Sequence, residues 1–364
     1  MMQPGITHTI SFTTPKQAAL LAAAAMVFSL SLPASAQQAP ARPAAKAAPA
    51  ANVQAELDAL IKAAKAEGEI VYYVAATENV AKRVTAAFSE KYGIKAPYVR
   101  LSSAALGQRY ATEAESGNIA AELAFFAGNV AGFANDAIKK GWVQSISEAG
   151  IPALKSGEFP ARFNKGPVAI VQIAPWGIGY RTDKLSGADI PRDWPDLLQP
   201  RFKGQIVLAN PSSSDAYVDL WATVLERHGE AFFTKLREQA PRQSGDGVQS
   251  LQAMAAGEGI AHPPTVPGQV QGLKDKGAPV DMTTPAYTTG VEMQVMLTAV
   301  AKSKHPNAAR LLAHYVLSRE GNKVFNDDPG GITMYDTAGL PKEYQNTKPE
   351  NLARKATIIK LRGF

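Results

Sequence analysis

Cysteine is absent from this chain of 364 residues. Its absence excludes disulfide bonds, thiolate metal sites and thiol nucleophiles, and with them the lipid-accepting cysteine of a bacterial lipoprotein. Charged residues are also sparse, at 19% against 46% apolar residues, so the composition is far from that of disordered chains. We therefore expect a globular protein with a substantial core and no lipid anchor.

Long apolar runs are also missing, because crossing a bilayer takes about 20 residues and the run over 18–32 is shorter. This run follows Lys16 and precedes Pro33-Ala34-Ser35-Ala36, which is the pattern of a secretory signal rather than of a membrane anchor. We expect cleavage after Ala36 and a periplasmic protein that begins at Gln37. Residues 37–52 are rich in alanine and proline without apolar periodicity, which predicts a flexible leader.

Basic residues are not concentrated in any one segment. The formal net charge of +6 falls to +5 when Lys16 is removed with the signal, and the other positive charges are scattered. No basic run is interleaved with aromatic residues, so a nucleic-acid partner is not expected. An anionic ligand or an acidic lipid surface is compatible with this charge.

Residues that ligate metals do not have the spacing of metal sites. His228, His262, His305 and His314 show no ligand spacing, and no His-Glu-x-x-His segment occurs. The acidic segment 327–331 lacks the alternating oxygen ligands and the final glutamate of a calcium loop, so it indicates a turn. We expect neither a bound metal nor a cofactor.

Strand and helix patterns alternate along the chain after the leader. Apolar runs predict strands, and helical periodicity closed by glycine predicts helices. Because strands that alternate with helices form parallel sheets, we expect a mainly parallel α/β sheet. The expected elements are a helix over 57–67, a strand over 70–74, a helix over 80–92, a strand over 96–101, a helix over 104–115, a strand over 122–126 and a helix over 131–140.

A second series of elements begins near Trp176, and the chain is too long for one ordinary core, so two lobes are expected. The series predicts strands near 178–180 and 205–208, helices near 216–227, 230–239 and 248–256, a β-like stretch over 290–300 and a helix over 307–317.

Three parts of the chain carry a resemblance to a known family. The segment 191–206 contains Pro191, Trp194, Asp196-Leu197-Leu198 and Lys203-Gly204 ahead of a strand, and Asn-Pro-Ser-Ser-Ser follows it at 210–214. Near the C-terminus, 304–321 contains His-Pro, Ala-Ala and Ser-Arg-Glu-Gly. From about Leu57 to Phe325, the sequence resembles the extracellular solute-binding proteins of bacterial ABC importers, in the branch of ferric-ion, thiamine, spermidine/putrescine and phosphonate binders.

The resemblance implies an α/β, two-lobed fold of the type II periplasmic-binding-protein kind, whose lobes are joined by crossing strands and close around a ligand in the cleft. It also implies a small-molecule ligand, an inner-membrane ABC permease as partner, a monomer and no enzymatic activity. We expect lobe 1 over 53–172 and 285–334, lobe 2 over 173–284, and a C-terminal tail over 335–364 that packs on the lobes. The motif residues Trp194, Leu197 and Ser318 are expected to be structural, as core residues and a helix cap.

Ligand-binding residues are expected in the loops after the carboxyl ends of the strands, where helix N-termini with free N–H groups gather. Two aromatic residues, Trp176 and Tyr287, are expected to line the hinge side of the cleft or, alternatively, to be buried packing residues. The loop candidates are Thr77, Glu78 and Asn79 after the first strand, Ser102 and Ser103 after the second, Gly128 and Asn129 after the third, and Ser212, Ser213, Ser214, Asp215 and Tyr217 in lobe 2.

The hydroxyl candidates have a structural alternative, because Thr77, Ser103 and Ser214 are also ordinary helix N-cap residues. In lobe 2, we expect the loop Ser212–Asp215 to hold an anionic group of the ligand, although the Asp215 carboxylate competes for the same N–H groups. A ligand that presents an amine there is the alternative.

Iron is the alternative solute, because ferric-ion binders in this branch use adjacent tyrosines of lobe 2. The corresponding segment, 261–268, reads Ala-His-Pro-Pro-Thr-Val-Pro-Gly and contains no tyrosine. Tyr72 and Tyr73 are adjacent, but side chains alternate along a strand, so their phenols cannot converge on one ion. An organic or phosphorylated anion is therefore preferred over iron.

Two further classes of function are considered as alternatives to a transport protein. A secreted hydrolase is disfavoured, because no Gly-x-Ser-x-Gly, Ser-x-x-Lys or Gly-x-x-x-x-Gly-Lys segment occurs and Gly245-Asp246-Gly247 reads as an isolated turn. A ligand-loaded receptor for a sensor kinase would have the same fold, and the sequence does not separate it from a transport protein.

Overall fold

The computed structural model describes residues 50–328 and 331–364, all within one compact unit, Lys46–Phe364. The predicted signal peptide over 1–36 and most of the predicted leader lie outside the described residues. Helix α1 (Ala50–Glu67) includes residues 50–52, so the end of the predicted leader is helical. No helix in the described part of the chain combines the length and the apolar character that a membrane span requires.

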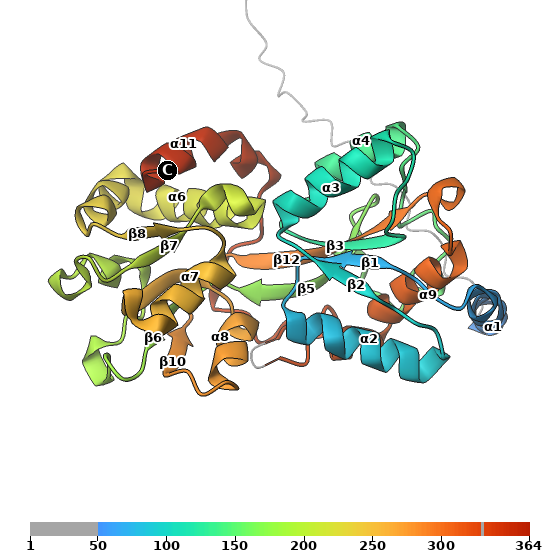
Figure 1. The fold of residues 1–364 in the computed structure, drawn as a ribbon, viewed down its shortest axis with the longest axis horizontal. Coiled ribbons are helices and arrows are strands. Elements are labelled where there is room, and N and C mark those ends of the chain that lie inside the picture. The colour runs from blue at the N-terminus through green and yellow to red at the C-terminus, as the bar shows by residue number, and fades with distance from the viewer. Residues whose placement is uncertain (1–49, 329–330) are drawn as a thin grey trace, which may run out of the picture. The chain divides into compact units, whose positions relative to one another are not determined.

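The larger sheet has six strands, in the order β2-β1-β3-β12-β4 with β5 paired to β12 (Figure 1). Strands β1 to β3 are mutually parallel, whereas β12 runs antiparallel to β3, β4 and β5. The expectation of a mainly parallel sheet is therefore wrong beyond β1 to β3. Apolar runs reveal strands but not their direction, and β12 enters this sheet from the other lobe. The bounds are β1 Tyr72–Val74, β2 Tyr98–Arg100, β3 Leu123–Ala127, β4 Val143–Gln144, β5 Ala169–Pro175 and β12 Gly290–Thr298.

Helices cover both faces of the larger sheet. Tyr72 points into a core shared with α1, α2, α9 and α10, whereas Tyr73 points into a separate core with α3 and α4. The two tyrosines thus face opposite sides of the sheet, as predicted. The bounds are α2 Glu78–Tyr92, α3 Ser103–Glu115, α4 Ala131–Lys139, α5 Pro152–Lys155, α9 Pro306–Leu317 and α10 Arg319–Phe325.

The second lobe contains an antiparallel sheet of order β10-β6-β9 and a parallel pair of β7 and β8. The segment α6 (Asp215–Glu238) consists of two helices joined at a kink, because Gly229 has a non-helical φ of 69° and ψ of 178°. The two helices predicted near 216–227 and 230–239 are therefore confirmed. The other bounds are β6 Gly177–Arg181, β7 Val207–Ala209, β8 Arg242–Ser244, β9 Ala261–Thr265, β10 Val280–Thr283, α7 Gly247–Ala253 and α8 Pro267–Lys274.

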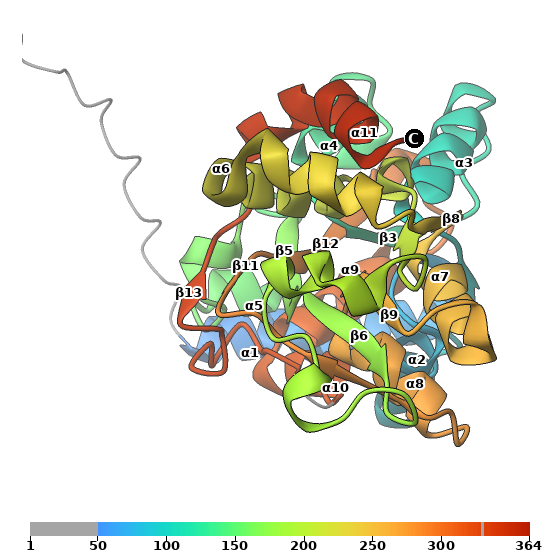
Figure 2. The ribbon, with the colours of Figure 1, turned by 90° about the vertical axis from the view of Figure 1, so that its left-hand side faces the viewer.

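The C-terminal segment packs on the second lobe. Helix α11 (Lys355–Arg362) and the 3-10 helix η8 (Pro349–Arg354) lie on α6 (Figure 2). Strand β13 (Glu343–Tyr344) pairs with β11 (Tyr287–Thr288), and Asn351 donates a hydrogen bond of 2.8 Å to buried Asp219 of α6. These contacts attach the last part of the chain to the lobe that holds α6.

The lobes are joined by neighbouring strands. Strand β5 leads directly into β6 of the second lobe. Strand β12 places Val291, near its start, in the second lobe's core and continues into the first lobe's core. Gly290 pairs with Pro175 at the crossing. The carboxyl ends of β1, β2 and β3 therefore face the second lobe across the crossing strands, which positions the site.

The residues that carry the family resemblance have the structural roles expected of them. Trp194 and Leu197 are fully buried in the second lobe's core. The indole Nε1 of Trp194 donates to the backbone oxygen of Tyr287 at 3.0 Å. Ser318 caps α10 by accepting from the Gly321 N–H. These predicted roles are confirmed.

Candidate functional site

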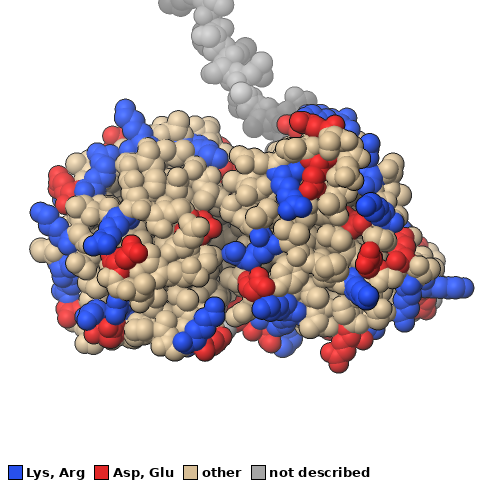
Figure 3. Space-filling model, in the orientation of Figure 1, with Lys and Arg blue, Asp and Glu red and all other residues tan. Residues whose placement is uncertain are grey.

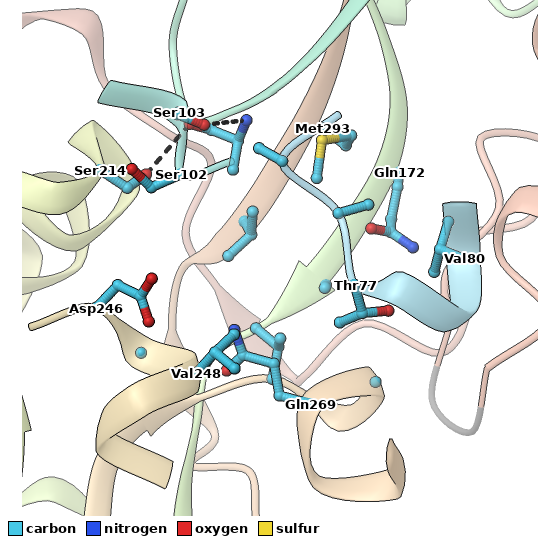
Figure 4. A pocket seen from close by; sticks show the side chains of 18 of the residues that line it. Thr77, Val80, Ser102, Ser103, Gln172, Ser214, Asp246, Val248, Gln269 and Met293 are labelled. Atoms are coloured by element: carbon cyan, nitrogen blue, oxygen red, sulfur yellow. Dashed lines mark hydrogen bonds between the residues drawn. The ribbon is translucent and has the colours of Figure 1, made fainter. Parts of the chain in front are cut away.

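A cavity lies between the two lobes, at the carboxyl ends of β1 and β2 (Figure 4). The space inside it is about 860 Å³ when the solvent at its open mouth is included. It is lined by Ala75, Ala76, Thr77, Val80, Arg100, Ser102, Ser103, Ala127, Gln172, Ala174, Trp176, Ser213, Ser214, Tyr217, Asp246, Gly247, Val248, Val266, Pro267, Gly268, Gln269, Val291, Met293, Asp328 and Gly331.

Two helices of the first lobe begin at this cavity. Thr77 is the N-cap of α2, but its side chain makes no capping bond, and its buried Oγ1 has no partner among the described residues. Ser102 is the N-cap of α3 and accepts from the Ala105 N–H at 3.4 Å. A helix start carries unpaired N–H groups and partial positive charge, so both helices favour an anion.

Arg100 supplies the full positive charge of the cavity. It ends β2, and its Nε donates to the backbone oxygen of Ala76 at 2.9 Å, which fixes the side chain. Within residues 50–328 and 331–364, no carboxylate lies at ion-pair distance from Arg100, and no other Lys or Arg lines the cavity. A half-buried guanidinium without a carboxylate partner can bind an anion with two parallel hydrogen bonds.

The predicted lobe 1 residues divide between the cavity and its surroundings. Thr77, Ser102 and Ser103 line the cavity itself. Glu78 and Asn79 line an adjoining pocket, which shares Thr77 and Arg100 with the cavity and opens toward α8. Asn129 lies in another hollow, between α4 and the C-terminal segment, and its Oδ1 accepts from the Ala131 N–H. The sequence rule of strand ends therefore led to the edge of the sheet at which this cavity lies.

The serines of lobe 2 are largely occupied by hydrogen bonds within the protein. Ser212 donates to Asn210 Oδ1 at 2.7 Å, and Ser213 donates to the Asn210 backbone oxygen at 2.8 Å. The Asp215 carboxylate pairs with Lys355 at 3.0 Å, so its charge is neutralised away from the cavity. These hydroxyls no longer have a free proton to donate to the anionic group expected there.

Ser103 and Ser214, which belong to opposite lobes, both form hydrogen bonds with the backbone of Ala127 (Figure 4). Ser103 Oγ accepts from the Ala127 N–H at 2.7 Å, and Ser214 Oγ donates to the Ala127 oxygen at 3.2 Å. A Cβ added to Gly128 would lie 2.9 Å from the Ala216 nitrogen, so the first lobe covers the start of α6 closely. Of the expected caps, Ser214 also caps α6, whereas Ser103 is not a cap, because Ser102 holds that position.

The two predicted aromatic residues have different surroundings. Trp176 lines the cavity and stacks on Tyr217, with ring centroids 4.9 Å apart. Tyr287 lies outside the lining, under the Arg227 guanidinium at 4.2 Å from its ring centroid. Burial, followed by the nearby charge of Asp246, raises the pKa of the Tyr217 phenol. Tyr217 therefore stays protonated at neutral pH.

Several cavity residues had weak signals in the sequence. Asp246 belongs to a Gly-Asp-Gly that reads as an isolated turn, yet it follows β8 and caps α7 by accepting from the Gln249 N–H at 2.9 Å. Gln172 lies on the crossing strand β5. Asp328 forms an ion pair with Arg83 at 3.0 Å. Applied to β2 and β8, the rule of strand ends could have found Arg100 and Asp246. The lining residues Gln172, Gln269 and Asp328 had no such signal in the sequence.

Histidine and carboxylate groups do not gather in the described part of the chain into a cluster of three or more that could hold a metal ion. His262 and His314 are buried, and desolvation lowers the pKa of each to about 4. His305 pairs with Glu122 at 2.9 Å. On the face seen in Figure 3, basic and acidic side chains are interspersed, and the molecule is hollowed between the two lobes.

A cleft between two α/β lobes joined by crossing strands defines a solute-binding protein of the type II periplasmic kind. The model of the bacterial extracellular solute-binding protein family matches residues 125–352, which is more than half of the chain. This chain belongs to that family.

This chain is similar to one further bacterial protein in sequence and to solved periplasmic binding proteins in structure. An uncharacterized protein of Haemophilus influenzae is 26% identical over 275 residues, which cover 72% of this chain and 76% of that protein. The structure of the periplasmic binding protein AfuA from Actinobacillus pleuropneumoniae, with fructose-6-phosphate bound, is 22% identical, has a TM-score of 0.57 and covers 78% of this chain and 88% of its own. Iron-bound HitA from Pseudomonas aeruginosa is 18% identical, has a TM-score of 0.61 and covers 81% of this chain and 99% of its own.

Proposed function

We propose that this protein captures a small organic anion, carboxylated or phosphorylated, in the cleft between its lobes and delivers it to an ABC permease in the inner membrane. The protein performs no chemistry on its ligand. A ligand that contacts both lobes favours the closed arrangement of an open and closed ensemble, and the permease responds to closure.

Arg100 carries the proposal. Its guanidinium lacks a carboxylate partner within the described chain, and it lies in the lining shared with Thr77 and Ser102 at the starts of α2 and α3. One full positive charge and two helix N-termini at one end of a cavity favour an anion through hydrogen bonds and electrostatics together. The binding of fructose-6-phosphate by AfuA is consistent with an anionic organic ligand.

The cellular setting follows from the family and from the sequence. Family members are extracellular, and the apolar run over 18–32 with its Ala-Ser-Ala site supports secretion to the periplasm with cleavage after Ala36. The protein acts there as a monomer. N-terminal sequencing of the secreted protein should begin at or within two residues of Gln37.

Ferric iron is less compatible with this cavity than an organic anion is. HitA is named as iron-bound, but the described lining here holds a single tyrosine, Tyr217, and so lacks a pair of tyrosines. Iron sites of the tyrosine type need phenolate oxygens. Adding ferric citrate to the purified protein should therefore produce no phenolate-to-iron absorption band.

The test begins with mass spectrometry of the solute that co-purifies with the secreted protein, followed by calorimetric titration of that solute. Arg100→Ala should weaken its binding at least tenfold, because losing a charge-assisted hydrogen bond costs about 1.5 to 3 kcal/mol. The affinity of Arg100→Lys should lie between those of the wild type and Arg100→Ala, because lysine keeps the charge but cannot form two parallel hydrogen bonds.

Arg242 provides the matched control, because it is exposed on β8 and outside the lining of the cavity. Arg242→Ala should bind as the wild type does. A cationic or metallic solute, or an Arg100→Ala variant that retains full affinity, would contradict the proposed anion site.

A further inference from the structure

The cavity presents an acidic side chain on the wall opposite its cationic end. Asp246 lies where β8 meets α7 in the second lobe, and its carboxylate points into the cavity (Figure 4). One of its oxygens accepts from the Gln249 N–H. No Lys or Arg of the described residues lies at ion-pair distance from it, whereas the other lining carboxylate, Asp328, is paired with Arg83. The second oxygen of Asp246 is thus left to accept a hydrogen bond.

A hydrogen-bond donor without an acceptor lies in the same lining. The Trp176 side chain is only 2% exposed, and its indole N–H has no acceptor among the described residues. A buried donor left unpaired costs free energy, so an acceptor from a bound molecule would be favourable. Trp176 stacks on Tyr217, and Tyr217 lies against Gly247, the residue after Asp246, because a Cβ there would collide with the Tyr217 hydroxyl. Asp246 and Trp176 therefore belong to one contiguous wall of the cavity.

The pairing of an acceptor with a donor discriminates between the groups that a ligand could present. An ammonium group offers only donors, so it would satisfy Asp246 and leave the Trp176 N–H unpaired. A hydroxyl group both donates and accepts. Resting on the anion-binding function proposed above, we propose that Asp246 and Trp176 select hydroxyl groups, so that the ligand is a polyhydroxylated organic anion held by its charge at Arg100 and by its hydroxyls on the second lobe.

The test uses pairs of probes that share an anionic group but differ in hydroxyls: fructose 6-phosphate against propyl phosphate, and gluconate against hexanoate. Phosphoethanolamine supplies the ammonium alternative. Calorimetric titration of the wild-type protein should give at least tenfold tighter binding for the hydroxylated member of at least one pair, and phosphoethanolamine should bind no better than propyl phosphate. A preference for phosphoethanolamine would overturn the proposal in favour of an amine-bearing ligand.

Two variants assign the preference to the named residues. Asp246→Asn keeps a good N-cap residue, so α7 should remain formed, and it should reduce the affinity for the hydroxylated probe at least tenfold without weakening the plain anion. Trp176→Phe removes the indole N–H but keeps an aromatic ring against Tyr217, and it should weaken only the hydroxylated probe, about threefold to tenfold. Asp275→Asn, an exposed residue beyond the end of α8, changes the net charge equally and should have no effect.

The possible failures are distinguishable. Equal binding within both pairs, or a preference that survives in Asp246→Asn and Trp176→Phe, would overturn the hydroxyl assignment while leaving the anion site in place. If none of the probes binds to the wild-type protein, the proposed anion-binding function fails, and the hydroxyl assignment fails with it.

Discussion

Acidification should destabilise the protein through His314. This side chain is 8% exposed in α9, and its Nδ1 accepts a hydrogen bond of 3.1 Å from the Ala153 N–H. Burial, assisted by the positive charge of Lys91, lowers the pKa of His314 to about 4. The imidazole is therefore neutral in the folded protein and loses its acceptor when it is protonated.

The direction and size of the effect follow from this lowered pKa. An unfolded histidine takes up a proton below about pH 6.5, whereas the folded one does so only near pH 4, so the unfolded chain binds the extra proton between these values. The contribution of His314 is fully present above pH 6.5 and is lost as the pH falls toward 4. The total loss is about 3 kcal/mol, of which about 2 kcal/mol is reached at pH 5.

A single substitution isolates this contribution. His314→Asn places an amide oxygen near the position of Nδ1 and does not titrate, while His262, the other buried histidine with a pKa of about 4, is kept in both proteins. Buried Asp219 and Glu292 have raised pKa values and contribute in the opposite direction, and they too are common to both. The difference between the two proteins therefore reports His314 alone.

The measurement is urea unfolding followed by tryptophan fluorescence at pH 7 and pH 5. The wild-type free energy of unfolding should fall by about 2 kcal/mol more than that of His314→Asn over this interval. Parallel losses in the two proteins would refute the assignment of His314 as a buried neutral acceptor.

Two further predictions concern helix packing in the first lobe. Glu67 accepts hydrogen bonds from two backbone N–H groups and one amide at the start of α9, so Glu67→Ala should lower the free energy of unfolding by about 2 to 3 kcal/mol in urea titration, and Glu67→Gln by less. An unchanged midpoint would show that water replaces these bonds. A Cβ at buried Gly321 would collide with the Tyr315 backbone oxygen, so Gly321→Ala should cost about 1 to 3 kcal/mol, whereas Gly132→Ala, in open space on α4, should be neutral or slightly stabilising. Equal thermal midpoints for the two glycine variants would contradict this packing.

Local signals were sufficient for most elements of the fold. Helix ends such as Gly93, with its φ of 70°, are determined by backbone conformations that glycine adopts easily, and they are therefore visible in the sequence. The opposite facing of Tyr72 and Tyr73 follows from strand geometry alone. The break at Gly229 between the two helices of α6 was predictable for the same reason as the helix end at Gly93, because its φ of 69° is one that glycine adopts easily.

By itself, the sequence determined the family, the alternation of strands and helices, and the edge of the sheet at which Thr77, Ser102 and Ser103 line a cavity, because each depends on neighbours in the chain. Only the tertiary structure decided which polar groups remain available to a ligand. Ser213 and Asp215 are engaged by Asn210 and Lys355, whereas the lining residues Arg100, Asp246 and Trp176 keep polar groups without a partner in the described part of the chain. A hydrogen bond between groups far apart in the chain depends on how the lobes pack, so no local pattern records whether a donor or acceptor is already occupied.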